Sequence, residues 1–178
     1  MGFTVLQASG RCFIQNAVFE KLNTLDYKGW TLTGAVNFYE SDVDIFNTDF
    51  RDNLCEDALN IIRSDFLTDS VTFRNTFGDA FDSDFCTGRV TRCTFIQPGN
   101  DAIDFSGSTI DISDCHVINA GDKGISCGEK STLSVSNCTI SNCNIGLASK
   151  DLSILNAMDC TVSDCFYGLA AYRKKPEY

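Results

Sequence analysis

A repeat of 22 residues runs through most of this 178-residue chain and limits the folds open to it more than any other feature. A small residue recurs at that interval without a slip, and a large apolar residue follows it each time. The pairs are Ala58–Leu59, Ala80–Phe81, Ala102–Ile103, Gly124–Ile125, Gly146–Leu147 and Gly168–Leu169. A period of about 20 to 50 residues is typical of solenoids, propellers and other stacked arrays.

The middle of each repeat carries a second apolar series at spacings of 22 or 23, made of Phe50, Phe73, Phe95, Val117, Ile140 and Val162. Apolar residues alternate at Ile110 and Ile112, with the period of two expected of strands, and no stretch keeps a helical period. A unit of short strands and polar turns cannot bury its own apolar face, so it must stack on its neighbours. The sequence therefore predicts an all-β parallel β-helix, a solenoid in which each turn of the chain is one rung.

The repeat resembles that of the pectin-lyase-like superfamily over roughly residues 35–172. The shared pattern is a small residue and an aliphatic, a polar turn, and an aliphatic pair, as in Asn100-Asp-Ala-Ile-Asp-Phe and Asn144-Ile-Gly-Leu. The resemblance implies a right-handed parallel β-helix, here of about seven rungs of about 22 residues. That superfamily contains lyases, hydrolases, epimerases, phage spikes and non-catalytic surface proteins, and the Gly-His-Gly of its pectin hydrolases is missing here. Whether the chain is an enzyme stays open.

Residues 1–34 are predicted to form an interrupted first rung, because Cys12 and Ile14 match Val43 and Ile45 at an offset of 31. This offset exceeds one repeat by nine residues, which implies a projecting loop at about residues 22–30. Residues 35–172 are predicted to be regular rungs.

Residues 173–178 form a basic tail that cannot cover the last apolar layer. Bare stack ends promote aggregation, so repeat proteins normally cap them. We therefore expect the chain to continue into a missing segment of a longer protein. Other segments of that protein, or end-to-end self-association, are the expected partners at the ends.

The ten cysteines follow the repeat, with Cys93, Cys115, Cys138 and Cys160 in one register and Cys143 and Cys165 in another. We expect a ladder of reduced packing residues, since a buried free Cys behaves as a small hydrophobe and no Cys-x-x-Cys pair is present. Reduced thiols favour a reducing compartment, and Met1–Phe19 lacks the pattern of a signal peptide. The resemblance instead implies an extracellular or cell-surface location, so localisation stays open.

The formal net charge of −10 argues against nucleic acid as a partner, because phosphate binding requires Lys and Arg. Cations or neutral polymers fit such a charge better. No apolar run reaches the length of about 18 residues that a membrane span needs.

Stacking predicts an acidic cluster on one face of the solenoid. The residue after each core aliphatic should point to solvent, which gives the row Asn60, Asp82, Asp104, Ser126, Ala148 and Ala170. Two parallel rows contain Asp84, Lys150, Asp57, Asp79, Asp101 and Lys123. Equivalent residues in neighbouring rungs lie about 4.8 Å apart. Five aspartates therefore gather within two adjacent rungs: Asp79, Asp82, Asp84, Asp101 and Asp104.

Clustered carboxylates raise one another's pKa values unless a cation intervenes, and oxygen ligands of this kind suit Ca²⁺. The candidate metal ligands are Asp79, Asp82, Asp101 and Asp104, with Ca²⁺ as the candidate cofactor. A carboxylate pair also suits glycoside cleavage. The resemblance implies a substrate groove along such a face, often with calcium ligands and a Lys or Arg base. The candidate catalytic residues are Asp82, Asp104 and Lys123, and the candidate substrate-binding residues are Asp84, Asp101, Lys150, Tyr27 and Trp30.

The leading hypothesis is a module that recognises an extended polysaccharide through this face, and in a sharper variant modifies it as a lyase, hydrolase or epimerase. One alternative is a passive solvated face, since Asp also favours turns. Another is a non-catalytic structural or interaction segment of a longer exported or surface protein, which Ile62, Ala148 and Ala170 on the same rows favour. Tyr27 and Trp30 equally suit covering the N-terminal end of the stack.

Overall fold

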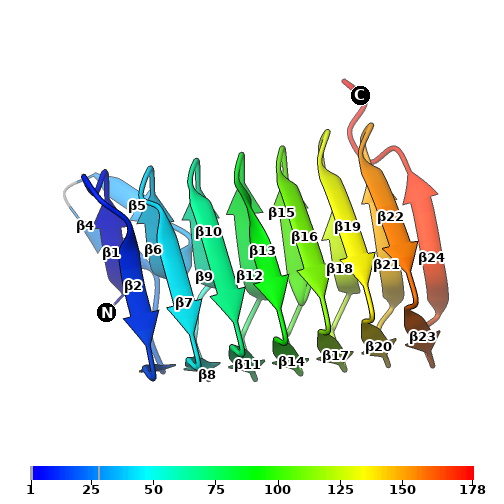
Figure 1. Cartoon of the computed structure of the whole chain (residues 1–178), viewed down its shortest axis with the longest axis horizontal. Coiled ribbons are helices and arrows are strands. Elements are labelled where there is room, and N and C mark those ends of the chain that lie inside the picture. The colour runs from blue at the N-terminus through cyan, green and yellow to red at the C-terminus, as the bar shows by residue number, and fades with distance from the viewer. Residues whose placement is uncertain (1, 28) are drawn as a thin grey trace.

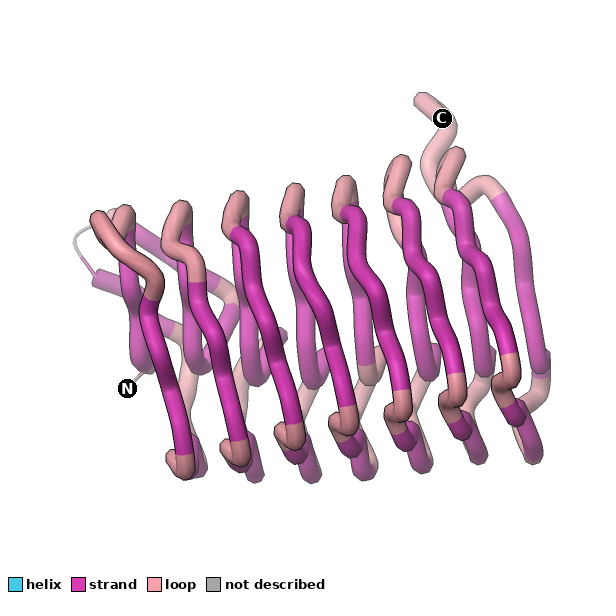
Figure 2. Tube along the Cα trace, in the orientation of Figure 1, coloured by secondary structure: helices cyan, strands magenta, loops and turns pink. Residues whose placement is uncertain are grey.

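The computed structural model describes residues 2–27 and 29–178, and every regular element in that part of the chain is a strand. Three parallel sheets wind along one axis (Figures 1 and 2). Sheet A contains β1 (Phe3–Leu6), β6 (Gly34–Tyr39), β9 (Asp57–Ile62), β12 (Asp79–Asp84), β15 (Ile103–Ser106), β18 (Lys123–Cys127), β21 (Ile145–Lys150) and β24 (Tyr167–Tyr172).

Sheet B contains β2 (Cys12–Gln15), β7 (Val43–Phe46), β10 (Asp65–Asp69), β13 (Thr87–Thr91), β16 (Thr109–Ser113), β19 (Thr132–Ser136) and β22 (Ile154–Met158). Sheet C contains β3 (Val18–Glu20), β8 (Asp49–Arg51), β11 (Thr72–Arg74), β14 (Thr94–Ile96), β17 (His116–Ile118), β20 (Thr139–Ser141) and β23 (Thr161–Ser163). Each rung gives one strand to each sheet in the order A, B, C. The all-β parallel solenoid predicted from the period is confirmed.

The strand register follows the sequence repeat. In sheet A, Phe81 pairs with Leu59 on one side and with Ile103 on the other, at 22 residues each way. All three side chains are fully buried and line the interior. The first rung pairs Cys12 with Val43, at an offset of 31. No helix long and apolar enough to cross a membrane occurs in residues 2–27 and 29–178.

The extra residues of the first rung form an antiparallel hairpin of β4 (Leu25–Tyr27) and β5 (Trp30–Leu32). The Trp30 ring packs edge-on against Tyr39 of β6, with ring centroids 6.1 Å apart. Thr33, which follows the hairpin, accepts a hydrogen bond from Asn60 of β9 at 3.2 Å. The hairpin is thereby fastened to sheet A at its N-terminal end.

Ladders of like side chains fill the interior. The rings of Phe19, Phe50, Phe73 and Phe95 stack in successive rungs, with centroids 5.1, 4.8 and 4.9 Å apart. The ten cysteines are free thiols. Three of the ladder predicted at Cys93, Cys115, Cys138 and Cys160 are fully buried, and Cys160 near the C-terminal end is half-buried.

One glycine makes room for an oversized neighbour. Gly88 of β13 pairs with Phe66 of β10, so both positions face the interior. A Cβ at Gly88 would lie 2.6 Å from the Phe66 carbonyl oxygen and 2.9 Å from its ring. The missing side chain lets the Phe66 ring lean toward the next rungs, where it meets Phe81 and Phe105 at centroid distances of 5.2 and 6.1 Å.

Candidate functional site

The structure brings the predicted aspartates together on the outer face of sheet A. Asp82 of β12 pairs with Asp104 of β15, and Asp79 pairs with Asp57 of β9. Asp101 lies in the turn just before β15, where its backbone N–H donates to the Asp79 carboxylate at 2.8 Å. Parallel pairing in register therefore places acidic groups from three successive rungs side by side.

This face is much less exposed than the sequence predicted. Several residues assigned to solvent-facing rows are buried, with exposed fractions of 0 to 6%: Asn60, Asp101, Lys123, Ser126 and Lys150. The prediction of exposure is wrong at these positions for two reasons. Asn60 is enclosed by its hydrogen-bond partners Thr33, Asp57 and Asp82. The two lysine side chains lie along the sheet, where Lys123 reaches Asp101 and Lys150 reaches Asp104. Figure 1 shows the successive strands β15, β18 and β21 of sheet A.

Lys150 is the clearest case of a side chain lying along the sheet. It belongs to β21, yet its Nζ lies 3.4 Å from Asp104 Oδ1 on β15, so it must cross β18 between them. The β18 residue in the row that contains Asp104 is Ser126, and Ala148 follows on β21. These small side chains leave room for the lysine chain. Asp104 of β15 and the outward aspartates of β12 stay half-buried.

Lys123 forms a buried ion pair with Asp101. Its Nζ lies 3.2 Å from both oxygens of Asp101 and 2.5 Å from Asp122 Oδ2. Burial lowers the pKa of Lys123, but the hydrogen bond to Asp122 and the charge of Asp101 outweigh it and raise the pKa above its ordinary value. The predicted catalytic residue Lys123 is therefore held protonated, which suits a charge partner and opposes the role of a base.

Burial gives the aspartates of this face unusual proton affinities. It raises the pKa of Asp79 to about 6, with a further contribution from Asp104. It raises the pKa of Asp101 to about 7, although the Lys123 charge works in the opposite direction. The pKa of Asp82 lies well above its ordinary value because of burial and the charge of Asp57. Near neutral pH this face therefore holds protons that exposed aspartates would have released.

Three of the four predicted metal ligands form a compact group. Asp79, Asp101 and Asp104 each offer an oxygen within 4.8 Å of the others, whereas Asp82 lies outside the group. Ca²⁺ takes about six to eight oxygen ligands with tolerant geometry. The three carboxylates fit part of such a shell. Because Lys123 already contacts both oxygens of Asp101, a cation here would share that carboxylate with the ammonium group.

Two exposed phenylalanines bracket the acidic strand β12, and the sequence prediction missed both. Phe77 precedes the strand by two residues and is 73% exposed, and Phe85 follows it directly and is 62% exposed. Phe85 has a positive φ of 57°, which is unusual for a bulky residue. The signal available in the sequence was the repeat position of Phe77, which elsewhere holds small residues: Cys55, Gly99, Gly121, Cys143 and Cys165.

A hollow of about 430 Å³ opens beside Phe85 at the edge of the face. Asp84, Ser106, Glu129 and Lys175 also line it. Glu129 accepts a hydrogen bond from Ser106 and forms an ion pair with Lys175 of the C-terminal tail. Burial, together with the charges of Glu129 and Asp104, raises the pKa of Asp84. This volume lies within the range of small-molecule sites.

The remaining predicted contacts lie elsewhere. Trp30 is 48% exposed and packs over β6, two strands away from β12 in sheet A, so the structure does not bring it to the aspartates. The backbone of Tyr27 pairs with Trp30, but its side chain lies outside the described part of the chain. Trp30 lies on Tyr39 of β6, and the alternative in which it covers the N-terminal end of the stack stays a prediction.

Comparison with known proteins identifies the fold. A model of the family described as the right handed beta helix region matches residues 33–177. Neither the curated proteins nor the solved structures contain a match. The family match covers most of the chain and agrees with the three parallel sheets, which confirms the resemblance to right-handed β-helices of the pectin-lyase-like kind. The chain therefore belongs to the family of right-handed β-helix regions.

Proposed function

We propose that the chain is a β-helix module that recognises an extended polysaccharide on the outer face of sheet A. One observation carries the proposal. The acidic outer side of β12 runs between two exposed aromatic rings, Phe77 and Phe85, and ends at the hollow beside Phe85. The two rings offer a packing surface at each end of a polar strip.

The chemistry of this strip suits a carbohydrate. Carboxylates accept hydrogen bonds from hydroxyl groups, and aromatic rings pack against the apolar C–H faces of sugar rings. Six residues of strand span about 20 Å, which is long enough for several sugar units. The glycan would cross sheet A along β12, from Phe77 over Asp82 to Phe85.

We further propose that Ca²⁺ binds at Asp79, Asp101 and Asp104 and bridges the module to the glycan. Support comes from the group of three oxygens and from Asp79 and Asp101, whose pKa values are raised first by burial and further by crowding with the negative charge of Asp104. A divalent cation would relieve that crowding. Sugar hydroxyls or waters would supply the other ligands.

Cleavage of the glycan is the sharper form of the proposal. A general acid requires a carboxyl whose pKa is raised, and burial together with the charge of Asp57 raises the pKa of Asp82 well above its ordinary value. Asp104 on the neighbouring strand would be the second carboxyl of the pair. Loss of glycan turnover in Asp82→Asn, with binding retained, would support this form.

The test of recognition is a calorimetric binding screen with neutral, uronate and amino-sugar oligosaccharides at constant Ca²⁺. We expect Phe77→Ala and Phe85→Ala to weaken binding of the selected glycan by about tenfold, because stacked rings contribute about 1 kcal/mol or more. Phe13→Ala is the matched control, since Phe13 is 71% exposed but lies on sheet B. Absence of binding to every oligosaccharide, or equal losses in the control, would favour the non-catalytic structural segment.

The test of the cation is a thermal melt with and without millimolar Ca²⁺. We expect Ca²⁺ to raise the melting temperature, because a ligand that binds only the folded state stabilises it. The rise should vanish in the double variant Asp79→Asn, Asp104→Asn. It should persist in Asp111→Asn, which removes an exposed carboxylate from sheet B. A Ca²⁺ effect of equal size in all variants would contradict this site.

A further inference from the structure

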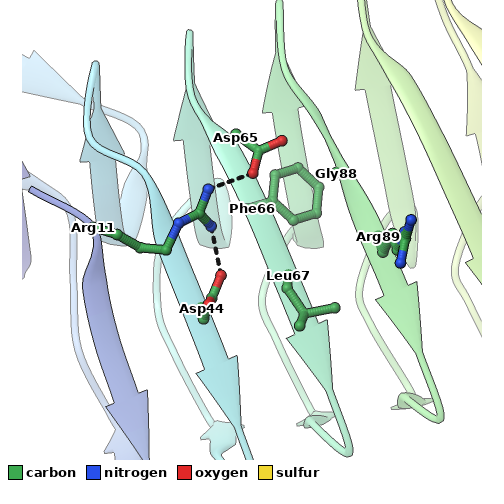
Figure 3. Close-up of a pocket in the computed structure, with 7 residues that line it drawn as sticks. All are labelled: Arg11, Asp44, Asp65, Phe66, Leu67, Gly88 and Arg89. Carbon is green, nitrogen blue, oxygen red and sulfur yellow. Dashed lines mark hydrogen bonds and ion pairs between the residues drawn. The ribbon is translucent and has the colours of Figure 1, made fainter.

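A second hollow, of about 340 Å³, lies on the outer face of sheet B, away from the acidic face (Figure 3). We propose that it binds a small hydroxy-carboxylate, of the size of one sugar acid, through the guanidinium group of Arg89. The proposal does not rest on the function proposed for sheet A. It rests on a fixed polar wall, an apolar floor and a charged group without a partner.

Arg11 builds the wall. It stands at the start of sheet B. Its guanidinium binds Asp44 Oδ1 on β7 at 2.6 Å and Asp65 Oδ1 on β10 at 2.5 Å. Thr87 of β13 donates to the other oxygen of Asp65 at 2.7 Å. These contacts fix the two carboxylates in place, and dashed lines in Figure 3 mark the two that Arg11 makes. Within residues 2–27 and 29–178 no hydrogen bond or ion pair engages the second oxygen of Asp44, so it can accept a hydrogen bond from a ligand hydroxyl group.

Leu67 of β10 forms the floor between two charged neighbours. In the register of sheet B it pairs with Asp44 on one side and with Arg89 on the other. Its half-buried side chain gives the middle of the hollow an apolar surface. A ring that lies on Leu67 would therefore reach both the Arg11 wall and Arg89.

Arg89 supplies the free charge. Its side chain is exposed, and no ion pair or side-chain hydrogen bond joins it to any residue in the described ranges 2–27 and 29–178. In the same sheet Arg11, by contrast, forms ion pairs with three carboxylates, those of Asp42, Asp44 and Asp65. A planar guanidinium offers a fork of N–H donors that matches a carboxylate.

The charges around the hollow favour a ligand of low charge. Among the lining residues Arg11 and Arg89 balance Asp44 and Asp65, while Asp42 beside Arg11 and Asp111 opposite Arg89 add negative charge at the border. A dianion such as a phosphate monoester would be repelled by the two aspartates. Burial raises the pKa of Asp65, but hydrogen bonds from Arg11 and Thr87 outweigh it and hold the pKa below its ordinary value. Asp65 therefore stays charged wherever the ligand carboxylate is charged.

The experiment is an NMR titration of the ¹⁵N-labelled full chain with glucuronate, and in parallel with methyl glucoside as the neutral ligand of equal size. We expect glucuronate to shift the amides of Leu67, Gly88 and Arg89 with a dissociation constant of about 1 mM. Methyl glucoside should shift them little. Arg89→Gln should weaken glucuronate binding by about tenfold or more, since a charge-assisted fork is lost.

Control variants separate this site from general charge effects. Arg92→Gln removes the same charge in the same rung from an arginine already paired with Asp69, and it should leave glucuronate binding unchanged. The double variant Asp79→Asn, Asp104→Asn should also retain it, which distinguishes this site from the one on sheet A. Equal shifts with methyl glucoside, tighter binding of a sugar sulfate, or full binding by Arg89→Gln would overturn the proposal.

Discussion

At the scale of single residues, neutral hydrogen-bond donors hold the like-charged aspartates of the acidic face together. Asn60 donates hydrogen bonds to Asp57 and Asp82 at 3.0 and 3.1 Å, and Asn100 donates to Asp79 at 2.7 Å. These neutral donors allow the carboxyls to be packed together without an ion for each. Burial on folding nevertheless raises the pKa values of these carboxyls.

Those pKa values predict that the protein becomes more stable as the pH falls from about 7.5 to about 5. Burial raises the pKa of Asp57 and of Asp79 to about 6, so the folded state binds protons that the unfolded chain releases. Their contribution to the free energy of unfolding is complete when both carboxyls are protonated. It is lost as the pH rises through their pKa values in the folded state. Melting temperatures across this range should therefore decline toward neutral pH.

Asp79→Asn should flatten that decline, and Asp111→Asn should not. Carboxyls whose pKa is lowered, such as Asp122, weaken the fold only at more acidic pH. A melting temperature that drops steadily toward pH 5 would contradict this account of the face.

Gly88→Ala tests the close packing of the interior. Its Cβ would press on the Phe66 backbone and ring, so we expect a loss of about 1–3 kcal/mol of unfolding free energy. Denaturant melts measure it. Gly10→Ala is the control, since nothing lies within 4 Å of a Cβ there. Equal stability of the two variants would show that Phe66 moves aside freely.

Sequence reasoning identified the aspartates but misjudged their surroundings. Their rows followed from the period, and the pairs of Asp82 with Asp104 and of Asp84 with Ser106 match it. The burial of this face could not be predicted from the repeat. A repeat gives the face on which Lys150 stands but not the direction in which its flexible side chain lies. The exposure of Phe85 could not be predicted either, because it depends on the backbone conformation of a turn.

At the scale of elements, the cysteines occupy several registers of the rungs, and their burial depends on their place along the axis. Cys93 and Cys115 are fully buried in successive rungs, while Cys12, Cys160 and Cys165 near the two ends are half-buried. Position in the stack thus sets the access of reagents to otherwise similar thiols.

We expect a thiol reagent to label only Cys12, Cys160 and Cys165 in the native protein, and all ten cysteines after denaturation. Burial protects the others because the reagent and the thiolate both require access to solvent. Mass spectrometry of labelled peptides measures this. Rapid labelling of Cys115 in the native state would mean that the rungs open locally.

At the scale of the whole molecule, each rung contacts its neighbours and little else, as expected of a solenoid. A variant lacking residues 82–103, which is one whole period, should therefore fold. The deletion joins Phe81 to Asp104 and keeps every inward and outward position, because Asp82 and Asp104 are paired equivalents.

Deletion of residues 82–102 is the matched control. After this deletion the joined strand is one residue longer than in the first variant. Asp104 would then point toward the interior, because a one-residue slip exchanges the two faces of a strand. Circular dichroism and cooperative melting should show a fold for the first variant and not for the second. Failure of both would show that the rungs are more interdependent than the sheets indicate.

The in-register stacking of rungs also gives the side chains of the outer surface regular spacings in two directions. Groups along the axis are displayed at steps of about 4.8 Å, and outward side chains along a strand at steps of about 6.7 Å. A polymer whose own repeat matches one of these steps meets equivalent contacts again and again, and one that does not drifts out of phase after a few units. If the proposed function holds, the solenoid would discriminate among polymers by their periodicity as well as by their chemistry.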